Sequence, residues 1–431
     1  MHDGTFVADG LVAPDGAPRP ALADLKKVYE PIRISIDADA TTAQIRNRHD
    51  VIDLRDFTFE WAVVEDEHVR AAGELVVENI SPERNANLPS GEGTGRMEGE
   101  QTATPCSRCA RSSRMTPDGR PQLTRSHGDR SSRPPSQPIS HLGGTAPGEE
   151  EAHSVAGIDF TARGALRSIG GAVPIVGPSL LLWRAPTDND LGSFEGQRPD
   201  ATVWEEAGLE HLHTRTVSVV SDGTRTMCAN VSRQQPPPAE STRTSSGPRR
   251  PRGADLDFSV TPIGGWRECD SWPRVGIEFE LPSDFDEVIW MGDGPDQSYP
   301  PDTGQGQRAG WWRSNVAALS TDYLRPQENG ARTCRSFLTI CDGRHEVTIR
   351  GNFSFTISRN TRSAVAQAEH DHELAADGPP VHLIIDFAQR GVGTAACGPG
   401  VLAKHELTPP RDVHGDIRLE VRTIAASGTD R

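Results

Sequence analysis

The chain has 431 residues and a formal net charge of −16, with 35% hydrophobic residues, 42 Gly and 34 Pro. This length allows two or three domains with their own cores, while the low apolar content and many turn-forming residues predict long loops. The negative charge argues against nucleic acid and anionic membranes as partners, because phosphates would be repelled. No apolar run reaches the ~18 residues of a membrane span and no signal-peptide pattern opens the chain, so we expect a cytoplasmic protein.

The cysteines support the same compartment. The chain contains 7 Cys at irregular spacing. An odd, irregular set predicts reduced thiols and no disulfide framework. Cys106 and Cys109 form a lone Cys-x-x-Cys pair without a second pair at metal spacing, so we assign them neither a zinc nor a redox role.

The N-terminal part begins with a loop rich in Gly, Pro and Asp and then alternates. Residues 25–36, 57–64 and 69–77 alternate apolar and polar side chains, which predicts strands of a half-buried antiparallel sheet. Trp61 is expected to be a core residue of this sheet. The pattern stops before a full set of strands is visible, so we predict a partial β-sandwich at residues 23–97.

Two stretches have a composition that does not favour a packed core. Residues 101–140 contain seven Arg, two Asp and no Glu, with almost no large apolar side chains. Burial there would not offset the entropy lost on ordering, so we expect residues 98–150 and 233–254 to be disordered. A frame-shifted reading of a GC-rich gene would give the same bias in both stretches. A basic arm for nucleic acid is a further alternative for the first, although it lacks interleaved aromatic residues.

Residues 151–424 have the pattern of a large antiparallel β-sandwich. Many short apolar strands separated by Gly and Pro turns favour this over a parallel sheet. Gly170 and Gly171 predict a hairpin turn, and residues 204–212 predict a short helical turn or bend. The further expected strands are residues 216–220, 257–263, 274–280, 287–291, 336–340, 346–350, 353–357, 381–387 and 417–421. The predicted fold class is therefore all-β with disordered inserts.

Polar side chains follow bends of this β scaffold at residues 180–190, 290–300 and 325–332. Gly or Pro bends the backbone there beside Asp, Gln, Glu, Asn or Arg. Such groups suit a ligand with many hydroxyls, or they cap the strands and satisfy one another. His370 and His372 are expected on one face of a strand, where they would suit a metal with a third ligand or be solvated.

Four of these motifs together resemble a known family. In chain order they are Trp183-Arg-Ala-Pro-Thr-Asp-Asn-Asp190, Gly292-Asp-Gly-Pro-Asp-Gln-Ser-Tyr-Pro300, Arg325-Pro-Gln-Glu-Asn-Gly330 and Gly391-Val-Gly-Thr-Ala-Ala-Cys-Gly-Pro399. They resemble the signature segments of the C-terminal β-sandwich of large, multidomain β-galactosidases of the lactose-operon type, in family 2 of the glycoside hydrolases. The resemblance covers about residues 155–424 and extends weakly to the N-terminus.

The resemblance implies three domains. Residues 1–22 would be the tail of the catalytic barrel, and residues 23–97 an immunoglobulin-like sandwich. Residues 151–424 would be the terminal sandwich, a galactose-mutarotase-like supersandwich, with residues 98–150 as the disordered or frame-shifted linker before it.

The resemblance also assigns roles to three residues. By position, the backbone carbonyl of Phe6 and the side chain of Asp9 would help hold a monovalent cation, sodium or potassium, beside the sugar. An ordinary turn is the alternative for Asp9. Asp9 and Cys397 would lie at the substrate, but Cys397 stands at or beside the place where some relatives have a Trp that stacks on the sugar, and a thiol offers no aromatic face. The family also uses magnesium, while this chain itself requires no cofactor.

The catalytic groups are missing from this picture. Hydrolysis with retention needs two carboxylates ~5 Å apart, one as acid/base and one as nucleophile. In the family both come from the barrel, where the acid/base Glu follows an Asn, and the sequence has no Asn-Glu pair. We therefore assign no catalytic residue.

The expected function is that of the C-terminal part of a β-galactosidase. The whole enzyme would hydrolyse terminal non-reducing β-D-galactose residues in lactose catabolism, would bind its β-galactoside through a separate barrel chain or domain, and would be an oligomer. The alternatives are a non-catalytic carbohydrate-binding or complementing subunit, and a gene remnant.

Overall fold

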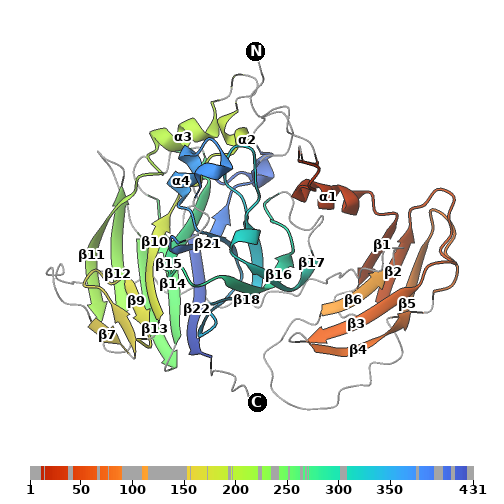
Figure 1. Cartoon of the computed structure of the whole chain (residues 1–431), viewed down its shortest axis with the longest axis horizontal. Helices are drawn as coiled ribbons and strands as arrows, with labels where there is room; N and C mark the ends of the chain where they lie inside the picture. Colours follow the sequence, from red (N-terminus) through yellow and green to blue (C-terminus); the bar gives the residue numbers. More distant parts are fainter. Residues whose placement is uncertain are drawn as a thin grey trace.

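In the computed structural model, the regular elements of the described residues are mostly β-strands with few helices (Figure 1), which confirms the all-β fold class. No helix in the described part has the length and apolar character needed to cross a membrane. The described residues are 11–13, 15–36, 42–65, 68–75, 77–89, 109–114, 153–155, 157–171, 173–192, 196, 198–221, 226–233, 242–250, 253–262, 266, 269, 271–300, 308–374, 378–392, 401–408 and 413–424.

The first element is a helix, α1 (Pro20–Val28), where the alternation over residues 25–36 predicts a strand. Pro20 is at the start of the helix, where its missing N–H leaves no bond unmade, and Lys26 and Lys27 lie in the last turn near the negative end of the helix dipole. These end signals outweigh an alternation of only a few residues. The prediction is therefore wrong for residues 25–31 and holds from β1 (Ile32–Ile36) onward.

Two small antiparallel sheets follow and form a lobe drawn in red and orange in Figure 1. In the first sheet β2 lies between β1 and β5, and in the second β3 lies between β4 and β6. A buried cluster draws on both sheets, since it includes Ile32, Ile45 and Phe59, so the two sheets share a core. The strands expected at residues 57–64 and 69–77 are present, although the first begins at Phe59 and the second ends at Leu75. The bounds are β2 (Thr42–Asn47), β3 (Phe59–Glu65), β4 (His68–Leu75), β5 (Asn85–Pro89) and β6 (Cys109–Arg114).

Strand β6 lies inside residues 98–150, for which the composition predicts disorder. The structure differs from that expectation at residues 109–114, which pair with β3 from Phe59↔Arg114 to Val64↔Cys109. Backbone N–H and C=O groups make these bonds, so a strand can add to a sheet edge without an apolar sequence. The other residues of this stretch lie outside the described part of the chain.

The later strands in the described part form one 16-stranded sheet, in which every pairing is antiparallel. Its main path is β11-β12-β13-β14-β22-β19-β18-β20-β21-β15-β10-β9-β8-β7, and β16 pairs with β17 and β18. The bounds are β7 (His153–Val155), β8 (Ile158–Phe160), β9 (Leu166–Ile169), β10 (Val173–Leu181), β11 (His213–Ser221), β12 (Thr226–Arg233), β13 (Thr242–Arg250), β14 (Gly253–Val260), β15 (Arg274–Leu281), β16 (Glu287–Gly294), β17 (Arg308–Asn315), β18 (Arg332–Cys341), β19 (His345–Arg350), β20 (Phe353–Ser358), β21 (Val381–Gln389) and β22 (Val413–Thr423).

The sequence predicts most of this sheet correctly. Gly170 and Gly171 have φ of 65° and 66°, and they join β9 to β10 as the predicted hairpin turn. All strands expected after this hairpin are present, and the expected bend at Trp204 belongs to helix α3 (Asp200–Glu206). Trp204, Trp272 and Trp290 are fully buried in one core that spans the large sheet.

Strands β7, β8, β12, β13 and β17 of this sheet are not predicted by the sequence. β13 falls within residues 233–254, which we expected to be disordered, yet residues 242–250 pair with β12 on one side and β14 on the other. A strand between two partners forms backbone bonds along both edges, and these do not depend on apolar composition. β17 pairs with β16 over its whole length.

Short helices gather at one end of the large sheet (Figure 1). These helices are α2 (Asp188–Leu191), α3 and α4 (Arg362–Gln367). The described residues also include the 3-10 turns η3 (Ala317–Leu319), η4 (Asp371–Glu373) and η5 (Ala403–His405). Because α2 belongs to the first polar segment, this end of the sheet carries the candidate site.

Gly292 provides a test of the sheet geometry. It faces Cys334 after a register shift in the β16–β18 pair, and a Cβ at this position would lie 1.9 Å from the carbonyl oxygen of Thr333. We predict that Gly292→Ala lowers the free energy of unfolding by about 3 kcal/mol, because a backbone atom cannot move aside easily. Urea denaturation measures this difference.

The matched control is Gly170→Asn. A Cβ at Gly170 would meet nothing within 4 Å, and Asn tolerates positive φ, so its cost should stay below about 1 kcal/mol. Equal losses in the two variants would contradict the described pairing of β16 with β18.

Candidate functional site

Arg184 is the centre of the candidate site. It follows the end of β10, and its side chain is completely buried. Its Nε and Nη2 donate to the two carboxylate oxygens of Asp190 at 3.1 and 2.7 Å. The guanidinium carbon of Arg184 lies over the ring of Trp204, 5.2 Å from the ring centroid. A planar fork with several donors suits this paired contact with a carboxylate.

The sequence between Arg184 and Asp190 fixes the position of the carboxylate. Thr187 caps helix α2: its hydroxyl accepts from the Asp190 N–H, and its own N–H donates to the Asp190 carboxylate at 2.9 Å. This reciprocal pair is a capping box. Asp190 therefore serves the helix cap and the guanidinium together.

The other side of Arg184 reaches a segment that is distant in sequence. Its Nη1 donates to the carbonyl of Arg390 and its Nη2 to the carbonyl of Gly391, both at 2.9 Å. The Gly391 N–H donates to the carbonyl of His405, and Arg390 pairs with Asp200 of α3 at 2.6 Å. Arg184 thus ties the first polar segment to the start of the fourth family-like motif.

Glu328 joins two further segments. Its side chain is fully buried and accepts from Arg274 at 2.7 Å and from the Tyr299 hydroxyl at 2.9 Å. Its backbone N–H donates to the carbonyl of Ala185 at 3.1 Å. All four family-like segments therefore meet in one cluster. We call it the buried polar network: Arg184, Asp190, Arg274, Tyr299, Glu328 and Asp386.

Asp386 is the last member of this network. Its Oδ1 lies 3.3 Å from Nε of Arg274, and the side chains of Arg274, Glu328 and Asp386 are all fully buried. Burial raises the pKa of Asp386 to about 6, with Arg274 opposing that rise. Burial also works to raise the pKa of Glu328, but the nearby charges of Arg274, Arg362 and Arg184 outweigh it, so the pKa of Glu328 is lowered. The pKa values of the two carboxyl groups are therefore shifted in opposite directions.

A second layer of polar contacts covers the network. Asp188 accepts from Arg325 and Gln327, Gln297 accepts from the Gly330 N–H, and Arg335 holds Asp293 through two bonds. Arg332 binds three backbone carbonyls, and burial lowers its pKa to about 10. The polar groups of the three bends thus largely satisfy one another. This favours the interpretation that these groups cap the strands and satisfy one another over the interpretation that they bind a ligand with many hydroxyls.

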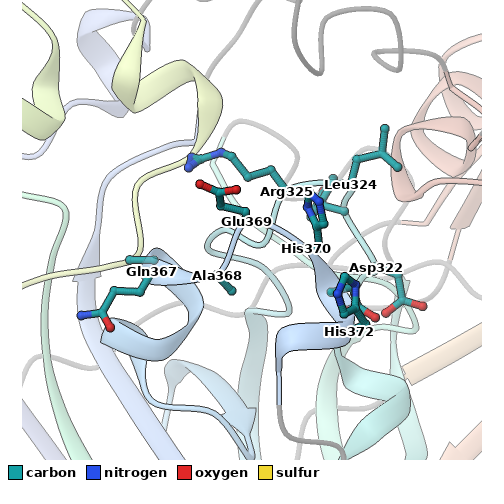
Figure 2. Close-up of a pocket in the computed structure, with 11 residues that line it drawn as sticks. Asp322, Leu324, Arg325, Gln367, Ala368, Glu369, His370 and His372 are labelled. Atoms are coloured by element: carbon teal, nitrogen blue, oxygen red, sulfur yellow. The ribbon is translucent and has the colours of Figure 1, made fainter.

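An open groove of about 1000 Å³ lies between residues 322–325 and 366–372 (Figure 2). His370 and His372 line it, with ring centroids 5.4 Å apart. They lie at the 3-10 turn η4 and not on a strand, so that expectation is wrong; a three-residue alternation is too short to specify a strand beside a turn that closes its own hydrogen bonds. Within the described ranges, no group of three or more His, Cys, Asp or Glu could hold a metal ion.

The three residues assigned from the family lie elsewhere. Phe6, Asp9 and Cys397 are outside the described residues, so their roles at a cation and at the substrate stay predictions. The sequence analysis did not single out Arg274 or Asp386. A signal for Asp386 exists, because it is one carboxylate within the otherwise apolar end of Val381-His-Leu-Ile-Ile-Asp-Phe387, and a charge in a buried strand needs a partner.

The family model of the β-galactosidase small chain matches residues 156–419, a range that contains the whole buried polar network. The chain belongs to this family. The β-galactosidase of Arthrobacter sp. (strain B7) is 30% identical over 455 residues, covering 95% of this chain and 43% of that protein. The β-galactosidase of Kluyveromyces lactis is 27% identical over 433 residues, covering 94% of this chain and 39% of that protein.

The chain thus spans about two fifths of the length of these curated relatives, and corresponds to a C-terminal portion of larger β-galactosidases. Among solved structures, galactose 1-epimerase from Lactobacillus acidophilus NCFM aligns with 63% of this chain and 93% of its own at 9% identity, with a TM-score of 0.32. A score of that size supports no conclusion about this chain.

Two carboxylates of the first motif of this small-chain domain should differ sharply in their importance. Asp190→Ala leaves the buried charge of Arg184 unpaired, so we predict a loss of about 3–5 kcal/mol in the free energy of unfolding. Asp188 is 45% exposed in its pair with Arg325, so Asp188→Ala should cost at most about 1 kcal/mol. Denaturant melts of both variants test this. Similar losses would contradict the described burial of the Arg184–Asp190 pair.

Proposed function

We propose that the chain is the non-catalytic C-terminal part of a retaining β-galactosidase. The family match over residues 156–419 carries this proposal, together with relatives named β-galactosidase that extend well beyond the region shared with this chain. The catalytic carboxylates would come from a barrel outside the described residues, as the resemblance implies. The substrate class would be terminal non-reducing β-D-galactosides.

The buried polar network gives this part of the enzyme a mechanical role. Arg184 holds the carbonyls of Arg390 and Gly391, from which the chain continues into the motif that contains Cys397. By fixing the base of that motif, the domain would position a segment at the mouth of the sugar site. The network would act by holding this segment in place, because Arg184 and Glu328 bind partners within the protein.

The remaining expectations belong to the whole enzyme. We propose a cytoplasmic oligomer that uses magnesium and a monovalent cation, with Phe6 and Asp9 among the ligands of the latter. The metal ions would serve the barrel, and no step assigned to this chain depends on them.

A complementation assay tests the proposal. The purified chain alone should release no nitrophenol from nitrophenyl β-galactoside above a vector control, because it supplies no catalytic pair. Mixed with the Arthrobacter enzyme truncated to lack the aligned region, it should restore activity that neither part has alone. Turnover by the purified chain would contradict the non-catalytic assignment, and a mixture that stays inactive while both parts are folded would contradict the proposed role.

A titration with galactose and lactose separates this role from that of an independent carbohydrate-binding subunit. Because Asp188, Glu328 and Asn329 already bind partners within the protein, we expect no saturable heat at millimolar sugar. Binding tighter than about 1 mM, which corresponds to roughly −4 kcal/mol, and lost in Asp188→Ala, would favour the carbohydrate-binding alternative instead.

A further inference from the structure

Asp386 occupies a position in the core that is built around a carboxyl group. It lies in β21, where it is paired with Gly276 of β15 on one side and Ser354 of β20 on the other. A Cβ at Gly276 would be 2.4 Å from Oδ1 of Asp386. β15 therefore has no side chain at the place that the Asp386 carboxyl group occupies. The space suits an Asp side chain better than a larger one.

Asp386 and Glu328 differ in the hydrogen bonds that their carboxylate oxygens accept. Neither carboxylate oxygen of Asp386 accepts a hydrogen bond, although both are buried. Its contact with Nε of Arg274 at 3.3 Å is an ion pair without hydrogen-bond geometry. Glu328, by contrast, accepts from both Arg274 and Tyr299 at its Oε1, and only its Oε2 has no hydrogen-bond partner. Arg274 therefore donates one hydrogen bond to Glu328 and none to Asp386, which it contacts only as an ion pair.

Among the described residues, no other positive group donates a hydrogen bond to Asp386. The charged groups whose fields reach Asp386 are Arg274 on β15, Glu328 before β18, Arg362 in α4 and Arg184 after β10. Arg184 is already bound to Asp190, and Nη2 of Arg362 donates to the carbonyl of Asn360. A buried carboxylate without donors costs several kcal/mol unless it takes up a proton.

We propose that Asp386 is a proton-binding site of the folded domain, and that loss of its proton loosens the buried polar network next to Arg390. This goes beyond the proposed function, since it assigns a pH-sensitive element to a part without catalytic groups. The ionised form adds a second negative charge beside Glu328. The Arg274 guanidinium then faces two ionised carboxylates, while its present geometry gives a hydrogen bond to Glu328 and none to Asp386.

The strand geometry carries the effect toward Arg390. Arg274 pairs with Gln389 across β15 and β21, and the Arg390 N–H donates to the carbonyl of Pro273, the residue before Arg274. Asp386 and Arg390 thus lie on one strand end held by one stretch of β15. A shift of Arg274 toward an ionised Asp386 would strain the pairing of Arg274 with Gln389 and the hydrogen bond from Arg390 to Pro273.

The direction of the stability change follows from the pKa of Asp386, which is about 6 in the folded protein against 3.8 as the ordinary value. A group whose folded pKa is raised contributes stability below its unfolded pKa and loses it as pH rises through its folded pKa. The contribution of Asp386 is therefore complete below pH ~4, falls as pH rises toward ~6, and is largely absent above ~7.

Infrared spectroscopy of the purified chain gives the direct test. A protonated carboxyl group has its own C=O stretching band, separate from that of a carboxylate. The chain has 61 Asp and Glu residues, and ordinary carboxyl groups lose their protons around pH 4. We therefore expect one component of the band to titrate with a midpoint near 6, and this component to be missing in Asp386→Asn. The control Asp416→Asn, at an exposed residue on β22, should keep the band. A parent spectrum without a component that titrates near pH 6, or such a component that persists in Asp386→Asn, would overturn the proposal.

Melting temperatures extend the test to the network. The difference between Asp386→Asn and the parent chain should shift in favour of Asn between pH 5 and 7 and stay constant above. Glu328→Gln provides a second variant that keeps Asp386: with the competing charge removed, Arg274 can serve Asp386, so the infrared midpoint should fall by at least about one pH unit. An unchanged midpoint would contradict the competition for Arg274.

Discussion

The buried guanidinium of Arg184 is the constraint on which the end of the large sheet depends. An ion removed from water is costly unless a counter-ion and further hydrogen bonds replace its hydration. Arg184 obtains the counter-ion from Asp190, which lies close to it in sequence, and its remaining bonds from Arg390 and Gly391, which lie 206 and 207 residues later. The capping box at Thr187, the buried turn after β10 and the end of β21 must therefore form together.

Arg274 is a second fully buried guanidinium that needs counter-ions. It lies between Glu328 and Asp386, so one positive charge faces two carboxyl groups in a place without solvent. Such a cluster is stable only when all its members are in place, because each missing partner leaves an uncompensated polar group. Hydrophobic residues of similar volume could pack there without that demand. The network therefore specifies one arrangement of the four segments, as befits a domain whose proposed task is to hold a segment in position.

The sequence predicts those parts of the fold that local patterns determine. Short apolar runs such as residues 274–280 and 381–387 give strands with the expected positions, and Gly170-Gly171 gives the hairpin turn, since each signal is contained in a few residues. β13 escapes prediction because its partners on both sides supply backbone bonds that its own composition does not announce. α1 begins at a proline signal that competes with a brief alternation.

The candidate site shows the same division. The polar motifs at residues 183–190, 292–300 and 325–330 could be found as motifs, and the alternative that they satisfy one another could be stated. Their pairing could not be, because Arg184 with Gly391 and Glu328 with Arg274 are brought together only by the closed sheet. Asp386 is a single carboxylate among apolar neighbours, and its partner on β15 depends on the register of two strands that are distant in sequence.

The central claim is that Arg184 fixes the segment at Arg390 and Gly391 through buried bonds. Hydrogen–deuterium exchange of Arg184→Lys tests it most directly, because Lys keeps the charge but cannot reach Asp190 and both carbonyls in one plane. We predict faster exchange at the amides of Gly391 and Glu328, with no change in β11 and β12 and none in the control Arg350→Lys, whose side chain is 52% exposed. Exchange that changes only around residues 183–192 would contradict the claim.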